Sequence, residues 1–318
     1  MNKRPWTIGV DIGGSKIEIA HVDQLGAIQL KKAWPVAKHG DPYPIIETLV
    51  ENIEKSLIGK SESPLGVGIG IAGQVDTNTG IVHFAPNLAW KSFPLGEELK
   101  KALNMPVVIT NDVRAATWGE WQFGSAVDCN DFVCLFIGTG IGGGVVSGGR
   151  LLLGSNNGAG ELGHLIVAKD GPICSCGNKG CVEAFAGGWA LAAHAKKALA
   201  QNAEARVLWE ALGPLSAKTV IQQFKHGDPI AKKIIEEARE ALIAAAITIV
   251  HAFNPQRFIL GGGLFHGLPE IKDWMHFGIK KNALPALAEK VEVLSSRLGL
   301  EAGVIGAATF AMKVLKKG

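Results

Sequence analysis

The feature that most constrains the fold of this chain is a unit of strand, glycine-rich turn and strand that occurs twice. The first copy has a β-rich run at 6–10, the turn DIGGSK at 11–16 and an alternating run at 17–22. The second copy has an apolar run at 132–137 and the turn GTGIGGG at 138–144, followed by a short apolar return. Such runs on either side of a glycine turn favour strands. The duplication predicts two similar lobes, each offering a turn to one ligand between them.

Both turns have the composition of a phosphate cradle. Adjacent glycines let backbone N–H groups approach an anion closely, and in the first turn Ser15 and Lys16 add a hydroxyl and a charge. A Gly-Gly hairpin on its own is more often only a hairpin, so the recurrence carries the inference. A third glycine turn, at 261–263, follows the strand expected at 257–260.

The second turn also matches the dinucleotide-binding pattern G-x-G-x-x-G through Gly138, Gly140 and Gly143. That pattern requires a helix to begin at the turn, so that its N-terminus faces the pyrophosphate. The segment VVSGGRLLLG at 145–154 has neither the period nor the composition of a helix. We therefore reject a dinucleotide-binding interpretation.

The segment 161–183, ELGHLIVAKDGPICSCGNKGCVE, concentrates metal-binding side chains. Cys174, Cys176 and Cys181 lie in a Gly-rich turn, and three clustered thiolates are typical zinc ligands in a chain without secretory features. His164 is the nearest imidazole and would complete a closed Cys3His site, although its spacing alone leaves this open. The alternative is a chance cluster of buried thiols. We expect Cys129 and Cys134, outside the cluster, to be core thiols.

A zinc with four protein ligands has no open position and cannot activate water, so we expect it to act as a clamp. It would fix His164 and the loop that carries Glu161 and Glu183, leaving these side chains to bind another ligand. The alternative is that Glu161 and Glu183 are solvated loop carboxylates and that His164 is an ordinary hydrogen-bonded histidine.

A further candidate site begins at Asn111-Asp112, where the strand expected at 107–110 runs into the helical pattern VRAATWGEWQFG. An Asp at such a junction is commonly an N-cap, which accepts backbone N–H groups of the first turn. Alternatively, Asp112 points from the end of a strand into a cleft, where ligands of α/β folds gather, and serves as a base. A residue at the start of a helix can do both.

Composition limits the classes of function. A chain of 318 residues with 47% hydrophobic content can bury a large core and is expected to form two domains. A formal net charge of +3 gives no electrostatic footprint for nucleic acid or an anionic membrane. The apolar run at 241–250 is too short to span a bilayer, and the start of the chain lacks the apolar core of a signal peptide. We therefore expect a cytoplasmic protein.

Apolar periodicity and turn residues predict the remaining elements of an α/β fold. Helices are expected at 41–60, 95–103, 187–201, 205–212, 217–224, 228–253, 273–282 and 303–314, and strands at 65–71 and 291–294.

In order along the whole chain, the series DIGGSK, GIAGQVD, PNLAW, TNDVRAA, GTGIGGG, ELGH, CSCGNKGCVE and ILGGGL resembles the ROK family of sugar kinases. The resemblance implies the two-lobed actin-like ATPase fold, which is ribonuclease H-like, with a cleft between the lobes. It implies a smaller α/β lobe at 1–111 plus 302–318 and a larger lobe, carrying the zinc loop, at 112–301. A homo-oligomer, dimer or tetramer, is also expected.

The resemblance assigns roles residue by residue. Phosphate and Mg²⁺ binding fall on Asp11, Gly13, Gly14, Ser15, Lys16, Gly138, Thr139 and Gly140, and the adenosine turn falls on Gly261, Gly262 and Gly263. Sugar binding falls on Gly73, Asn87, Asn111, Asp112, Glu161, His164 and Glu183, with Asp112 as the general base. Structural Zn²⁺ falls on His164, Cys174, Cys176 and Cys181. Loss of this metal is then expected to weaken sugar binding and to spare ATP. Two positions depart from the family pattern: Ser15 stands in place of the usual Thr, and Arg114 in place of a second Asn.

The resemblance implies ATP-dependent phosphorylation of glucose to glucose 6-phosphate, because the loop 87–90 (NLAW) looks like that of the glucose enzymes. The alternatives within the family are an N-acetylhexosamine kinase, a fructokinase and a polyphosphate-using glucokinase. The non-enzyme alternative is a sugar-responsive repressor. We disfavour the repressor because the first glycine turn begins at residue 13, which leaves no room ahead of it for a DNA-binding domain.

Overall fold

The computed structural model describes residues 4–36 and 40–316, and the chain divides into two compact units. Unit 1 comprises the chain up to Asp128, the segment Leu151–Ala159 and the chain from Arg297 onward. Unit 2 comprises Cys129–Arg150 and Gly160–Ser296. Each unit has its own hydrophobic core.

Unit 1 is built on a five-stranded sheet with the order β3-β2-β1-β4-β8. Its strands are β1 (Trp6–Ile12), β2 (Lys16–Asp23), β3 (Ile28–Pro35), β4 (Val67–Ile71) and β8 (Val107–Asn111). The first glycine turn joins β1 to β2 as an antiparallel hairpin, while β1, β4 and β8 run parallel. The carboxyl ends of the three parallel strands therefore meet at one edge of the sheet.

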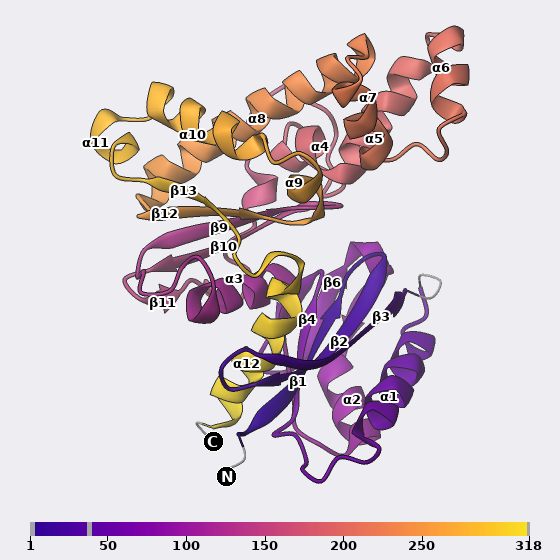
Figure 1. The fold of residues 1–318 in the computed structure, drawn as a ribbon, viewed down its shortest axis with the longest axis vertical. Coiled ribbons are helices and arrows are strands. Elements are labelled where there is room, and N and C mark those ends of the chain that lie inside the picture. Colours follow the sequence, from indigo (N-terminus) through magenta and orange to yellow (C-terminus); the bar gives the residue numbers. More distant parts are fainter. Residues whose placement is uncertain (1–3, 37–39, 317–318) are drawn as a thin grey trace. The chain divides into compact units, whose positions relative to one another are not determined.

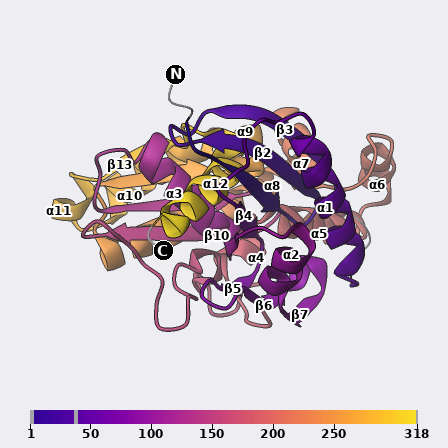
Figure 2. The same ribbon diagram turned by 90° about the horizontal axis from the view of Figure 1, so that it is seen from below.

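Helices cover both faces of this sheet. The apolar sides of α1 (Tyr43–Leu57) and α2 (Leu95–Leu103) form a core with the strands, and α12 (Ala302–Leu315) packs on β1, β2 and β4 (Figure 1). The helix α3 (Asp112–Phe123) packs along α12. A small sheet of β5 (Gln74–Asp76), β6 (Ile81–Ala85) and β7 (Trp90–Phe93) lies beside α2 (Figure 2). A single 3-10 turn, η1 (Pro86–Leu88), joins β6 to β7.

Unit 2 repeats this sheet, with the order β11-β10-β9-β12-β13. Its strands are β9 (Phe132–Ile137), β10 (Ile141–Ser147), β11 (Arg150–Leu151), β12 (Arg257–Gly261) and β13 (Glu292–Ser295). The second glycine turn joins β9 to β10 antiparallel, and β12 runs parallel to both β9 and β13. When the strands are numbered along the chain within each five-stranded sheet, both sheets have the order 3-2-1-4-5, so the recurrence predicted from the two turns is confirmed.

The helices of unit 2 pack on one another and on its sheet around a large core, and a smaller buried cluster includes Cys174 and Cys181. They are η2 (Leu162–His164), α4 (Val182–Ala186), α5 (Gly188–Leu199), α6 (Ala203–Glu210), α7 (Ala217–Lys225), α8 (Pro229–Phe253), α9 (Gly263–Gly267), α10 (Ile271–Asn282) and α11 (Pro285–Ala288). The long α8 begins where Asp228 accepts the N–H of Ala231 at 2.9 Å, and it ends at Asn254, whose φ is 44°. No helix in the part of the chain that the structure describes is both long and apolar enough to cross a bilayer.

The observed units differ in their boundaries from the lobes expected from the sequence. A boundary after residue 111 would separate α3 from α12, the helix with which it packs most extensively. The contacts instead keep α3 in unit 1, together with η3 (Gly299–Glu301), which leads into α12.

Candidate functional site

At the carboxyl edge of the unit 1 sheet, residues far apart in the sequence come together. The parallel register aligns Ile12 with Ile71 and Ile71 with Asn111, so three strands end side by side. Just beyond these ends, the Nδ2 group of Asn111 donates to the Gly73 carbonyl at 3.1 Å. This bond joins two of the predicted sugar-binding positions.

Asn111, and not Asp112, is the N-cap of α3. Its Oδ1 accepts the backbone N–H of Arg114 at 3.0 Å, and its Nδ2 also donates to Asp112 Oδ1 at 3.0 Å. Asp112 is the first residue of the helix and not its N-cap. The expectation that the Asp at this junction caps the helix is therefore wrong, because its neighbour supplies the cap. The arrangement holds the Asp112 carboxylate at the end of β8.

A second carboxylate lies close to this edge. Asp11 is the penultimate residue of β1, and a Cβ placed on Gly303, at the start of α12, would come within 2.6 Å of its Oδ2. Burial and the nearby charges of Asp112 and Glu18 raise the pKa of Asp11 to about 7. A divalent cation would relieve this crowding of negative charge, so the donor set fits Mg²⁺.

The first glycine turn, Gly13–Lys16, packs against the loop that carries Asn87. The turn is closed by a 3.0 Å bond from the Gly13 N–H to the Lys16 carbonyl. A Cβ on Gly14 would lie 3.0 Å from the Cβ of Asn87, a distance at which the neighbour must shift. The Nζ of Lys16 pairs with the buried Glu18 carboxylate. A predicted phosphate position and a predicted sugar position are thus in contact within unit 1.

In unit 2 the second glycine turn, Gly138–Gly140, is held by hydrogen bonds from the start of α5. The first two N–H groups of α5 donate to its carbonyls, Gly188 to Gly138 at 2.9 Å and Trp189 to Thr139 at 3.1 Å. The carbonyl of Gly140 accepts the N–H of Gly138 at 2.9 Å. Within the described part of the chain, the N–H groups of Thr139 and Gly140 have no protein acceptor. With its carbonyls occupied, the turn has two amides available for an anion.

The third glycine turn, Gly261–Gly263, lies beside the second. The parallel register aligns Gly261, at the end of β12, with Phe136 near the end of β9. At the second turn the chain continues as the strand β10 and not as a helix. The rejection of a dinucleotide-binding fingerprint is therefore confirmed.

Glu183 lies beneath the second turn, with 8% of its surface exposed. Its Oε2 accepts the N–H of Ile141 at 2.7 Å, and a Cβ on Gly140 would meet the same oxygen at 2.5 Å. Its Oε1 accepts from the Trp189 indole at 3.2 Å and from the Ser175 hydroxyl at 3.3 Å. The alternative that Glu183 is a solvated loop carboxylate is therefore wrong.

The predicted metal ligands converge in unit 2. The ligand atoms of His164, Cys174, Cys176 and Cys181 all lie within 4.8 Å of one another. His164 Nδ1 is 3.6 Å from the Cys174 sulfur, and the sulfurs of Cys176 and Cys181 are 3.7 Å apart. Ligands about 2.0–2.3 Å from a tetrahedral zinc lie about 3.5–3.8 Å apart. The set therefore fits a tetrahedral metal.

Local structure builds this cluster. In the cysteine loop, residues 171–181, the Cys174 N–H donates to the Asn178 carbonyl at 2.8 Å, and the Gly177 N–H donates to the Cys174 carbonyl at 2.9 Å. Burial and the neighbouring thiols raise the pKa of Cys181 to about 12, and burial raises that of Cys174. A bound cation would reverse this trend by favouring the thiolates.

Besides the predicted metal ligand atoms, this part of unit 2 presents polar groups that can bind another ligand. Because Nδ1 of His164 faces Cys174, its Nε2 is the ring nitrogen that remains for another ligand. Glu161 immediately precedes η2, and its side chain is exposed.

Three side chains organise the site in ways that sequence reasoning did not anticipate: it left the role of Arg114 open, and it missed Asn157 and Ser175. Arg114 is buried and donates from Nη2 to the Asn157 carbonyl at 2.6 Å, while Asn157 donates to Asp76 at 3.3 Å. These bonds hold the segment Leu151–Ala159 in unit 1. They also show what the side chain of Arg114 contacts at the position where the family pattern has an asparagine. The third is Ser175, whose only sequence signal is its place between two cysteines.

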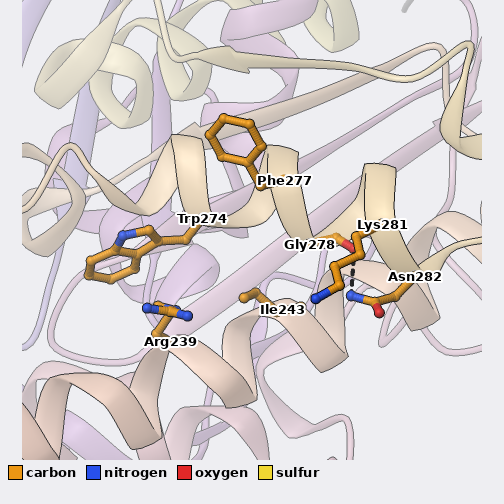
Figure 3. Close-up of a pocket in the computed structure, with 7 residues that line it drawn as sticks. All are labelled: Arg239, Ile243, Trp274, Phe277, Gly278, Lys281 and Asn282. Carbon is orange, nitrogen blue, oxygen red and sulfur yellow. Dashed lines mark hydrogen bonds between the residues drawn. The ribbon is translucent and has the colours of Figure 1, made fainter.

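A hollow of about 400 Å³ lies elsewhere, between α8 and α10 (Figure 3). Its lining consists of Arg239, Ile243, Trp274, Phe277, Gly278, Lys281 and Asn282. It contains no carboxylate and none of the glycine turns, so it is separate from the candidate site.

Two copies of one sheet, each with a glycine turn in its first hairpin, define the actin-like ATPase class. A family model described as the ROK family matches residues 7–314, and the chain belongs to this family. It is 34% identical to the glucokinase of Streptomyces coelicolor, over 96% of this chain and 97% of that protein. It is 29% identical to the xylose repressor of Bacillus spizizenii, over 96% of this chain and 76% of the repressor.

Among solved structures, the chain resembles a ROK family glucokinase from Streptomyces griseus in complex with glucose and AMPPNP. The TM-score is 0.81 at 33% identity, and the match covers 97% of this chain and 99% of that one. The likeness therefore extends over both units, and the fold class expected from the sequence is confirmed.

Proposed function

We propose that this chain is a hexose kinase that transfers the γ-phosphate of ATP to glucose and yields glucose 6-phosphate. The observation that carries the proposal is the likeness, over nearly the whole chain, to a glucokinase solved with glucose and an ATP analogue. The 34% identity to the glucokinase of Streptomyces coelicolor supports the same activity.

In this proposal Asp112 accepts the proton of the attacking sugar hydroxyl. The role is supported by its place at the carboxyl end of β8, where Asn111 is the N-cap of α3 and donates to the Asp112 carboxylate at 3.0 Å. Gly73, Asn87 and Asn111 bind the sugar from unit 1. Glu161, Glu183 and the Nε2 group of His164 supply the remaining hydrogen bonds to sugar hydroxyls, and a substrate that lacks a matching group is then discriminated against.

Phosphoryl transfer requires alignment and charge stabilisation more than covalent chemistry. The amides of the first and second glycine turns bind the phosphates, with the hydroxyl of Ser15 and the charge of Lys16, and the turn at 261–263 holds the adenosine. Asp11 is the side chain that would hold Mg²⁺, and the ion would neutralise charge on the phosphates. The raised pKa of Asp11, about 7, supports this assignment.

His164 and the three cysteines are proposed to hold a structural Zn²⁺. The donor set of one imidazole and three thiols, with neighbouring ligand atoms 3.6 and 3.7 Å apart, supports zinc over a harder cation. The four residues occupy every position of a tetrahedron, so the metal would take no direct part in the reaction.

A kinase assay over a panel of hexoses tests the function. Glucose, fructose, mannose and N-acetylated hexoses are each supplied with ATP and, separately, with polyphosphate. We expect the highest kcat/KM for glucose with ATP. A preference for an N-acetylhexosamine, for fructose or for polyphosphate would identify another activity of the family.

The likeness to a xylose repressor makes a sugar-binding regulator the second candidate. A regulator would bind the sugar in calorimetry without transferring phosphate, whereas a kinase does both. The proposal also includes a cytoplasmic location and a homo-oligomer, dimer or tetramer, as expected from the family resemblance. Cell fractionation and light scattering test these two parts.

A further inference from the structure

One buried carboxylate joins the second glycine turn to the cysteine loop. Glu183 Oε2 accepts the Ile141 N–H at 2.7 Å, immediately after the turn. Its Oε1 accepts the Ser175 hydroxyl at 3.3 Å and the Trp189 indole at 3.2 Å. Ser175 lies between Cys174 and Cys176, so the Glu183 carboxylate has the turn at one end and the cysteine loop at the other.

The turn depends on such support because glycine has wide conformational freedom. Gly138 and Gly140 lose more backbone entropy on ordering than other residues would, so external bonds must hold them. The start of α5 fixes the carbonyls of Gly138 and Thr139. The exit of the turn is fixed by the bond from Ile141 to Glu183, and the 2.5 Å approach to Gly140 shows how closely the carboxylate lies against the backbone.

We propose that Glu183 is a positioning residue that couples order in the cysteine loop to the geometry of the second glycine turn, so that Ser175 influences nucleotide affinity. The inference rests on the proposed function, in which this turn binds the phosphates of ATP. A carboxylate has about four acceptor sites, and three donors occupy Glu183, so one site remains for a sugar hydroxyl.

The coupling changes one expectation from the sequence. Metal loss was expected to weaken sugar binding and to spare ATP. Because Ser175 lies between two of the predicted ligands, metal loss also releases its hydroxyl from Glu183. Nucleotide binding is then expected to weaken together with sugar binding.

The test compares Ser175→Ala with Ser175→Thr and with Lys179→Ala in the same loop. Lys179 is exposed, and it supplies none of the three hydrogen bonds to the Glu183 carboxylate. Calorimetry measures the Kd of a non-hydrolysable ATP analogue with Mg²⁺ and, separately, the Kd of glucose. We expect Ser175→Ala to weaken the analogue about three- to tenfold, a fraction of what a hydrogen bond to a charged group contributes. Ser175→Thr and Lys179→Ala should leave its affinity within about twofold. Ser175→Ala should weaken glucose less than the analogue, because Glu183 supplies only one of several hydrogen bonds to the sugar, and the other two variants should leave glucose affinity within about twofold.

Amide hydrogen exchange supplies a readout that does not depend on activity. The Ile141 N–H should exchange faster in Ser175→Ala, because its acceptor is less firmly held. Chelation of the metal from the parent protein should produce the same increase in exchange and the same weakening of the analogue. The effects of chelation and Ser175→Ala should be less than additive, because both act through one contact.

Unchanged analogue affinity together with unchanged Ile141 exchange in Ser175→Ala would overturn the coupling. Equal weakening of glucose and analogue would also overturn it, since that result indicates general loosening of unit 2. The proposed function fails separately: a parent protein that binds the analogue but phosphorylates no hexose refutes the kinase, while the Ser175 effect on Kd still tests the coupling.

Discussion

Asp112→Asn is the substitution that most directly tests the reaction. The structure predicts that the variant keeps its fold, because Asn111 Oδ1 and not Asp112 caps α3. The loss of a negative charge from the first turn of the helix costs at most about 1 kcal/mol. The new amide can still accept from Asn111 through its oxygen, but it cannot take a proton.

General-base catalysis typically contributes about 10²–10⁴-fold. The variant should therefore lose about 3–5 kcal/mol of transition-state stabilisation, which appears as a fall in kcat. Glucose affinity, measured by calorimetry, should change by less than about threefold, because most of the hydrogen bonding survives.

Asn111→Ala is the matched control for stability. It removes the cap and the bond to the Gly73 carbonyl, so the free energy of unfolding should fall by about 0.5–2 kcal/mol from the cap alone. In thermal unfolding, Asn111→Ala should therefore be less stable than Asp112→Asn. If Asp112→Asn retains kcat within about tenfold of the parent, Asp112 is not the general base.

Three further predictions concern the charges, the metal and the first turn. Without Mg²⁺, the pKa of Asp11 is raised from 3.8 to about 7, so the folded state binds the Asp11 proton more tightly than the unfolded state does. The contribution of Asp11 to the free energy of unfolding should therefore rise as pH falls from about 7 towards 3.8. In thermal unfolding, Asp11→Asn or added Mg²⁺ should remove this pH dependence. The parent should contain about one zinc per chain and Cys176→Ser much less, with lower stability; a fully active parent without zinc would remove the clamp hypothesis. Gly14→Val should weaken both glucose and ATP in calorimetry, because its Cβ would lie 3.0 Å from Asn87; loss of ATP binding alone would contradict this contact.

Several features of the fold were predictable because their signals are contiguous in the chain. The two glycine turns with flanking strands occupy short segments, and a duplicated segment tends to fold in the same way twice. The observed sheets share the order 3-2-1-4-5, which the repeat anticipated as two similar lobes. The cysteine cluster was equally visible, since Cys174, Cys176 and Cys181 fall within eight residues.

Other elements gave weak local signals. The strand β3 has an exposed and charged pattern, and β5, β6 and β7 are short, so periodicity did not distinguish them from loops. At the start of α3, the expected cap was Asp112, although its neighbour Asn111 has a similar capping preference. Only the hydrogen bond from Arg114 N–H to Asn111 decided between them.

The tertiary structure decided which distant groups act together. Asp11 and Asp112 are 101 positions apart in the sequence, and they influence each other because β1 and β8 end at the same edge of one sheet. Glu183 carries no sign in the sequence of its bond to Ile141, which lies 42 residues earlier. The sequence determined which residues have the chemistry of a phosphate turn, a base and a metal ligand, because this chemistry belongs to individual side chains and short motifs. The pairing of those residues was decided by strand register and helix packing, which depend on contacts between segments far apart in the chain.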